Sequence, residues 1–181
     1  MRKLFGCCTV MLLSLAVVAL SSHAQMDKTK RPSPPAKAEF KFGDGKTITV
    51  NYSSPRMKGR RIFGELVPFD KVWRAGANEA TTFVTDATLS VGDTTVPAGS
   101  YTLFAIPAQD KWTLIISKKT GEWGTEYPGE ANDLARVEMK LSKLPSPLEN
   151  FTIAFDKTGK GCTMRLDWET TRAGVEIAEK K

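Results

Sequence analysis

Histidine and cysteine are scarce in this sequence. Its 181 residues include one histidine, His23, and three cysteines, Cys7, Cys8 and Cys162. Zinc sites, disulfides and histidine-based catalytic triads are built from these side chains. All but Cys162 lie within residues 1–24, so the fate of that stretch decides which chemistry the functional chain retains.

Residues 1–24 have the pattern of a secretory signal peptide. Arg2 and Lys3 precede an apolar stretch from Val10 to Leu20. Ser22-His23-Ala24 then supplies the small residues that precede a cleavage site, here before Gln25. The apolar stretch is short for a membrane span. We therefore expect cleavage, export to the periplasm or the cell exterior, and no stable membrane span afterwards.

Removal of this peptide leaves no histidine and one cysteine. The remaining chain has 24 cationic and 20 acidic residues, because Arg2 and Lys3 are lost, and so a net charge of +4. An intramolecular disulfide, a Cys/His metal cluster and histidine-based catalysis are excluded from it. Cys162 begins an apolar series that alternates with polar residues up to Trp168, which predicts an inert, inward-facing thiol. The sequence also has no calcium-loop motif, and we expect neither a metal nor a cofactor.

Alternating apolar and polar residues recur along the rest of the chain. This period of two is typical of half-buried strands, and continuously apolar runs are typical of central ones. The alternating series are 48–52, 137–141 and 151–155, and the continuous runs are 101–106 and 112–116. The pattern predicts an all-β fold, an antiparallel β-sandwich or jelly roll with about nine or ten strands, with an open barrel as the alternative.

Prolines and glycines mark the limits of this fold. Residues 25–36 are polar and rich in proline, which predicts an extended, weakly ordered leader. Residues 37–178 then form a single domain. Pro145-Ser146-Pro147 predicts a turn, and short helical turns are expected around Phe69–Trp73 and Glu130–Leu134.

One long segment, from Ser53 to Asn78, lacks the alternation. Connections of this length in a compact domain usually have a function or a structure of their own. Four cations lie close together in its first part, and a Trp-Arg pair follows. The cations are Arg56, Lys58, Arg60 and Arg61, and the pair is Trp73-Arg74.

The motifs of this segment resemble those of a known family. They are Ser53-x-Pro55, Lys58-Gly59-Arg60-x-Ile62-Phe63-Gly64-x-Leu66-Val67-Pro68 and Val72-Trp73-Arg74-x-Gly76-Ala77-Asn78-Glu79-Ala80-Thr81. Further matches lie at Pro97-Ala98-Gly99-x-Tyr101, Trp112-Thr113, Trp123-Gly124 and Trp168-Glu169-x-Thr171-Arg172. Together they are similar to the secreted bacterial "domain of unknown function 2911" family. The resemblance covers about residues 33–178, supports the fold and export, and assigns no catalytic residues, because the family itself has no assigned activity.

The chemistry of the loop suggests a binding module for an anionic or glycan ligand. Guanidinium groups bind carboxylate, sulfate or phosphate in pairs of hydrogen bonds, and an indole face stacks on a sugar. The candidate ligand-binding residues are Arg56, Lys58, Arg60, Arg61, Trp73, Arg74, Asn78 and Glu79. The alternative is structural: the apolar residues between Ile62 and Trp73 close one end of the sandwich, and the cations form its solvated face.

A second hypothesis is a carboxylate-based glycan hydrolase. Glycoside hydrolysis requires two carboxyl groups at a suitable separation and no histidine. Glu79, beside the Trp-Arg pair, is the candidate acid, with Asp70, Glu122 or Glu126 as its partner. A third possibility is a purely structural or protein-interaction domain.

Nucleic acid is not expected as a partner. The predicted export and the dispersed cations argue against it, although the calculated pI is about 9.3. The cationic loop could also contact anionic lipid headgroups or cell-wall polymers. The sequence leaves the oligomeric state open.

Overall fold

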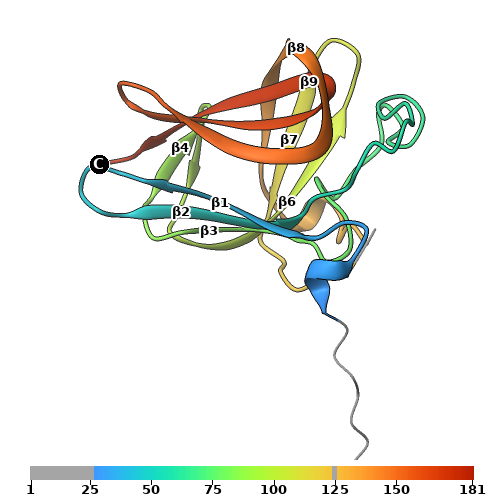
Figure 1. The fold of residues 1–181 in the computed structure, drawn as a ribbon. Coiled ribbons are helices and arrows are strands. Elements are labelled where there is room, and N and C mark those ends of the chain that lie inside the picture. The colour runs from blue at the N-terminus through green and yellow to red at the C-terminus, as the bar shows by residue number, and fades with distance from the viewer. Residues whose placement is uncertain (1–26, 124–125) are drawn as a thin grey trace, which may run out of the picture.

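The computed structural model describes residues 27–123 and 126–181 (Figure 1). The predicted signal peptide, with His23, Cys7 and Cys8, lies outside the described residues. The described part contains one antiparallel sheet in the order β1-β2-β3-β6-β7-β8-β9-β4-β5. The strands are β1 (Pro35–Lys41), β2 (Thr47–Ser53), β3 (Thr81–Thr85), β4 (Leu89–Val91), β5 (Thr94–Val96), β6 (Gly99–Pro107), β7 (Trp112–Ser117), β8 (Asp133–Lys157) and β9 (Gly161–Glu179). The all-β prediction is therefore confirmed.

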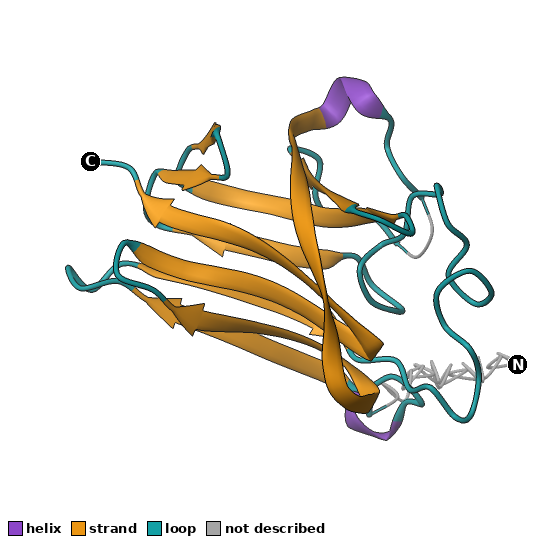
Figure 2. Cartoon of the chain, turned by 90° about the horizontal axis from the view of Figure 1, so that it is seen from above, coloured by secondary structure: helices purple, strands orange, loops and turns teal. Residues whose placement is uncertain are grey.

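Helical structure in the described part is limited to two short 3-10 turns, η1 (Lys28–Lys30) and η2 (Glu130–Asn132) (Figure 2). Within 27–123 and 126–181, no helix is long and apolar enough to cross a bilayer. The turn expected around Glu130–Leu134 is present as η2, whereas the one expected around Phe69–Trp73 is wrong. There the chain runs beside β6: Trp73 and Ala105 exchange two backbone hydrogen bonds, each 2.7 Å from N to O.

Two long strands fold the sheet over on itself. β8 and β9 form a hairpin that curls over the β1–β2–β3 side of the sheet (Figure 1). Its register shifts twice between Lys143 and Thr152, and Glu169, on the facing strand, has a φ of 54°. The turn predicted at Pro145–Pro147 is wrong, because β8 continues through it. Proline lacks an N–H group, so it fits where the strand ladder is interrupted and the hairpin bends.

The segment after β2 crosses to β8 and joins the two layers at one end. The Met57 amide donates to the Glu149 carbonyl at 2.8 Å, and the Phe151 amide donates to the Pro55 carbonyl at 2.9 Å. The Ser54 hydroxyl also donates to the Phe151 carbonyl, at 2.8 Å. The start of the long loop is therefore fixed to the core.

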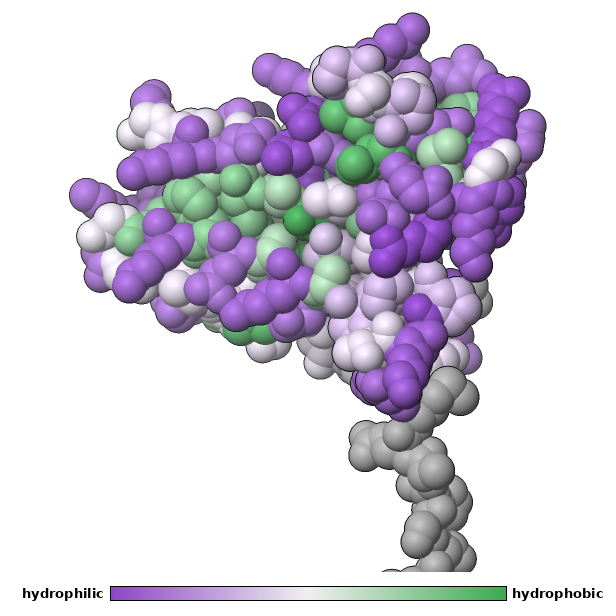
Figure 3. All heavy atoms as spheres, in the orientation of Figure 1, coloured by the Kyte–Doolittle hydropathy of each residue, from purple (hydrophilic) through white to green (hydrophobic). Residues whose placement is uncertain are grey.

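Farther along, β1 and β8 lie side by side without strand pairing. β1 is an edge strand, and its Phe40 packs against Phe155 of β8 with ring centroids 6.1 Å apart. Figure 3 shows an apolar strip on this face, between the β1–β2 layer and the β8–β9 hairpin. The sheet is therefore open here.

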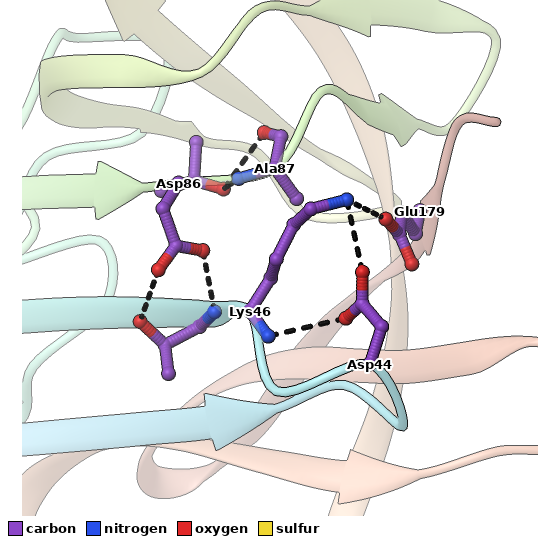
Figure 4. Close-up of polar contacts among 7 residues, drawn as sticks. Asp44, Lys46, Asp86, Ala87 and Glu179 are labelled. Carbon is purple, nitrogen blue, oxygen red and sulfur yellow. Dashed lines mark hydrogen bonds and ion pairs between the residues drawn. The ribbon is translucent and has the colours of Figure 1, made fainter.

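An ion-pair cluster ties the end of β9 to the turn between β1 and β2 (Figure 4). Lys46 pairs with Asp44 at 2.9 Å and also with Glu179. The hydrogen bonds that Lys46 donates to the carboxylates of Glu179 and Asp44 raise the pKa of Lys46 above its usual value. Beside it, Asp86 accepts a hydrogen bond from the Thr47 amide at 2.6 Å. This end of the sandwich is thus held by polar contacts.

The core reaches its densest aromatic packing at the opposite end. Phe63 and Trp73 of the long loop meet Trp112, Phe151 and Trp168 of the sheet, with ring centroids from 4.7 to 6.3 Å apart. We call these five residues the aromatic cluster. Cys162, elsewhere in the core, is fully buried, and burial raises the pKa of its thiol to about 12, as expected of an inert cysteine.

Candidate functional site

The long loop, residues 54–80, emerges at the end of the molecule remote from the C-terminus (Figure 1). Of the five non-glycine residues with positive φ in the described chain, four lie in this loop: Lys58, Asp70, Ala75 and Asn78. Each such residue costs on the order of 1 kcal/mol, less for asparagine and aspartate, whose side chains bond locally. Strain of this kind persists where surrounding contacts fix the backbone, and it often accompanies functional sites.

A pocket of about 360 Å³ lies beside this loop. It is lined by Ser33, Pro55, Arg60, Leu66, Val67, Pro68, Lys71, Val72, Trp73, Arg74, Gly76, Ala77, Phe104 and Trp168. The charged residues of this lining are three cations, Arg60, Lys71 and Arg74, and no acidic residue of the described chain belongs to it. We call this the Arg74 pocket. Its charge favours an anion.

Arg74 is the cation of the pocket that is both partly buried and without a hydrogen-bond partner in the described chain. Its Nε atom is buried and has no hydrogen-bond partner among residues 27–123 and 126–181. Within the same residues, no carboxylate oxygen lies within 4.0 Å of its guanidinium nitrogens. Burial lowers the pKa of Arg74, but a guanidinium remains charged at any physiological pH. A charge held this way lacks a counterion that the described protein could supply.

Arg60 also lines the pocket but is partly occupied by its own loop. Its Nε atom donates to the Met57 carbonyl at 2.9 Å, and Nη2 donates to the Arg56 carbonyl at 2.7 Å. These bonds satisfy carbonyls of a turn that contains Lys58 and Gly59, both with positive φ. Arg60 therefore fixes the turn and leaves Nη1 free of these bonds.

The remaining cations of the predicted cluster do not line the pocket. Arg56 is opposite Asn150 in an isolated β-bridge, and the exposed Lys58 uses its backbone amide to bond Glu149 at 2.9 Å. Arg61 is exposed and lies 3.8 Å from Glu65. The four clustered cations are thus neighbours in sequence, but the structure brings only Arg60 to the pocket.

Trp73 has two roles that the sequence presented as alternatives. It lines the Arg74 pocket and belongs to the aromatic cluster, where it stacks on Trp168 at 6.0 Å. Ile62, Phe63 and Val67 are buried, as the structural interpretation of the loop predicted, whereas Leu66 of the same set is exposed. The loop closes the end of the sandwich, and residues of the same loop form part of the pocket wall.

Asn78 and Glu79 hold the segment that precedes β1. The Asn78 side-chain amide donates to the Ser33 carbonyl at 2.9 Å. Glu79 pairs with Lys28 and Arg31, both at 2.9 Å. Neither Asn78 nor Glu79 lines the pocket, whereas Ser33 does. Where the sequence predicted a weakly ordered leader, the structure has η1, these contacts and the start of β1.

Glu79 does not have the properties of a general acid. Hydrogen bonds from Lys28 and Arg31 lower its pKa to about 2, whereas a glycosidase acid needs a raised pKa. Of the partners considered for it, Glu122 lies beside the next residue along the chain, because the Glu122 carbonyl accepts the Ala80 amide at 3.3 Å. Neither Asp70 nor Glu126 lines the Arg74 pocket. The lowered pKa of Glu79 and the absence of these acids from the pocket lining therefore give the hydrolase hypothesis no support.

Of the fourteen residues that line the pocket, three were predicted as ligand-binding: Arg60, Trp73 and Arg74. Among the others, Ser33, Phe104 and Trp168 lie outside the long loop. The sequence predicted Phe104 only as part of a central strand, and it lies in β6. Ser33 lies in the stretch that was predicted to be a leader. Lys71 is an isolated exposed cation two residues before Trp73. A prediction that counted every cation of the loop would have included Lys71. No local sequence signal marks Phe104 or Ser33 as lining residues.

The fold and the loop motifs define an all-β domain whose long loop carries the candidate site. The chain belongs to the DUF2911 family: the family model described as "Protein of unknown function (DUF2911)" matches residues 33–177. This confirms the resemblance found in the sequence motifs. No curated protein and no solved structure matches the chain.

The contacts of Glu79 predict that the segment 27–34 loosens in acid. The pKa of Glu79 is lowered from 4.5 to about 2 in the folded state, so its stabilising effect is complete above about pH 4.5 and is lost as the pH falls towards 2. Hydrogen exchange of the segment, corrected for intrinsic pH dependence, should show protection falling through this window. Glu79→Gln should show the low protection already at neutral pH. Equal protection of both proteins at neutral pH would contradict the prediction.

Proposed function

We propose that this domain is a binding module for a small anionic ligand, which it holds in the Arg74 pocket. The observation that carries the proposal is a partly buried guanidinium without a partner in the described chain, at a pocket lined by cations and by no described acid. Buried charges in proteins are normally paired. A bound carboxylate, sulfate or phosphate would provide the missing partner, including one carried by a sugar.

The backbone around Arg74 supports a preformed site. The paired hydrogen bonds between Trp73 and Ala105 fix the residue before it to a central strand. After it, the Thr81 hydroxyl donates to the Ala75 carbonyl at 2.9 Å, and a Cβ added at Gly76 would lie 3.1 Å from the Ser53 carbonyl oxygen. Sites held on rigid elements lose little entropy when a ligand binds.

We further propose that binding takes place outside the cytoplasm, at the cell envelope. The export pattern of residues 1–24 supports this location. Loss of His23 with residues 1–24 argues against histidine-based hydrolysis, and the lowered pKa of Glu79 argues against carboxylate-based glycan hydrolysis.

The test is a titration of the protein without residues 1–24 with acetate, phenylacetate, glucuronate, sulfate and phosphate. NMR of the arginine Nε–H groups reports on Arg74 directly. At least one of these anions should shift the Arg74 signal. Arg74→Gln should then bind that anion roughly ten- to a hundredfold more weakly, because it loses charge-assisted hydrogen bonds.

Arg61→Gln is the matched control. It removes the same charge from the same loop, at an exposed side chain outside the pocket. Its affinity should stay within about twofold of wild type, as for exposed ion pairs generally. The proposal fails if no anion of the panel perturbs Arg74, or if the two variants lose affinity equally.

A further inference from the structure

The walls of the Arg74 pocket are mostly apolar. The apolar residues of the lining are Pro55, Leu66, Val67, Pro68, Val72, Trp73, Ala77, Phe104 and Trp168. Phe104 and Trp168 are almost completely buried, so they form the inner wall. Leu66 is 44% exposed, one of three large hydrophobic side chains exposed in the described chain. An exposed leucine at the entrance would gain from apolar contact with a ligand.

Few hydrogen-bonding groups are available to match a sugar. The side chains of the lining that have polar atoms are Ser33, Arg60, Lys71, Arg74 and the two tryptophans. The Trp168 Nε1 group donates to the Glu149 carbonyl at 3.2 Å. Arg60 already donates two hydrogen bonds to backbone carbonyls of its own loop. Hydroxyl groups brought against such walls would lose water without gaining partners, which costs affinity for each of them.

The cations of the Arg74 pocket favour a ligand with a single negative charge. Of the three cations, Lys71 is exposed and Arg60 is partly occupied, which leaves Arg74 as the one cation that is both partly buried and unpartnered in the described chain. A planar guanidinium matches a carboxylate through two parallel hydrogen bonds. A phosphate dianion would bring a second charge into the pocket without a second desolvated cation to meet it.

We infer that the ligand is a monocarboxylate with a compact apolar body, such as an aromatic or short aliphatic acid, with its carboxylate at Arg74 and its body against Leu66 and Trp73. This inference rests on the proposed function and narrows its ligand class. A volume of about 360 Å³ is at the lower end for small-molecule pockets. It suits a single ring or a short chain and excludes an extended polymer from the interior.

Two ligand series test the inference by calorimetry. In the first, acetate, butanoate and hexanoate differ only in apolar length, and each added methylene should tighten binding by up to roughly fourfold. In the second, phenylacetate should bind more tightly than glucuronate, phenyl phosphate and neutral phenylacetamide. Leu66→Ser should reduce the gain per methylene. Val84→Ser is the matched control, since Val84 is exposed on β3 and does not line the pocket.

The outcomes separate the inference from the proposed function. If glucuronate or phenyl phosphate binds at Arg74 as tightly as phenylacetate, the monocarboxylate inference is wrong and anion binding stands. If affinity does not change with the length of the aliphatic chain, the monocarboxylate inference is likewise wrong and anion binding stands. If phenylacetamide binds as well as phenylacetate, or no anion binds, both are wrong.

Discussion

Trp168→Ala should lower the free energy of unfolding by about 3–5 kcal/mol, the usual cost of removing a buried aromatic side chain. Trp168 is 1% exposed and contacts Phe63, Trp73 and Phe151 with ring centroids 5.8 to 6.2 Å apart. Its indole N–H also bonds the Glu149 carbonyl. The change would therefore leave a cavity where the long loop meets the sheet, together with an unpaired carbonyl.

Urea unfolding followed by far-UV circular dichroism measures this loss without depending on tryptophan fluorescence. Trp123→Ala is the matched control, because Trp123 is 60% exposed. Its free energy of unfolding should change by no more than about 0.5 kcal/mol. Equal losses in the two variants would show that the aromatic cluster does not anchor this end of the fold.

The fold class could be predicted because the alternation of apolar and polar residues directly reflects burial on one face of a strand. β2 shows this: Ile48, Val50 and Tyr52 are buried and the residues between them are more exposed. The bend of the β8–β9 hairpin could not be predicted in the same way. Pro145 and Pro147 are compatible both with a turn and with a bulged strand, and the choice depends on pairing with distant residues of β9.

The position of the candidate site was predictable, but much of its composition was not. The loss of alternation after Ser53 correctly marked the loop that carries Trp73 and Arg74. Charge density along the sequence, by contrast, says nothing of the direction in which each side chain points. Arg61 lies beside Arg60 in sequence and pairs with Glu65 outside the pocket. Contacts with the segment before β1 likewise decided the role of Glu79.

Binding and structural closure need not be competing roles for this loop. Trp73 packs in the aromatic cluster with one part of its surface and lines the Arg74 pocket with another. A loop that must be buried to close the sandwich also has a fixed backbone, and a fixed backbone holds Arg74 in one place. For this reason Trp73→Ala would affect stability and binding together, whereas Arg74→Gln isolates binding.

Asp167→Asn should destabilise the fold by roughly 2–3 kcal/mol, because it removes the buried charge that links the two halves of β9. Asp167 is 1% exposed and precedes the bend at Glu169. It accepts hydrogen bonds from Arg172, beyond the bend, at 2.8 and 2.9 Å, and it also pairs with Arg165. Loss of a fully buried partner costs about 3–5 kcal/mol. The smaller value is expected here because the Arg172 and Arg165 side chains are 38% and 22% exposed, so water can partly replace the carboxylate.

Asp156→Asn provides the control for this prediction. Asp156 pairs with the same Arg165 at 2.8 Å, but its side chain is 53% exposed. Removing its charge should therefore cost less than about 1 kcal/mol. Hydrogen exchange of the amides at 169–173 gives a second readout, and Asp167→Asn should increase exchange there more than in the β6–β7 ladder. If the two variants are equally stable, or if exchange at the bend is unchanged, the bend is held by backbone pairing and packing alone, without help from the Asp167 ion pairs.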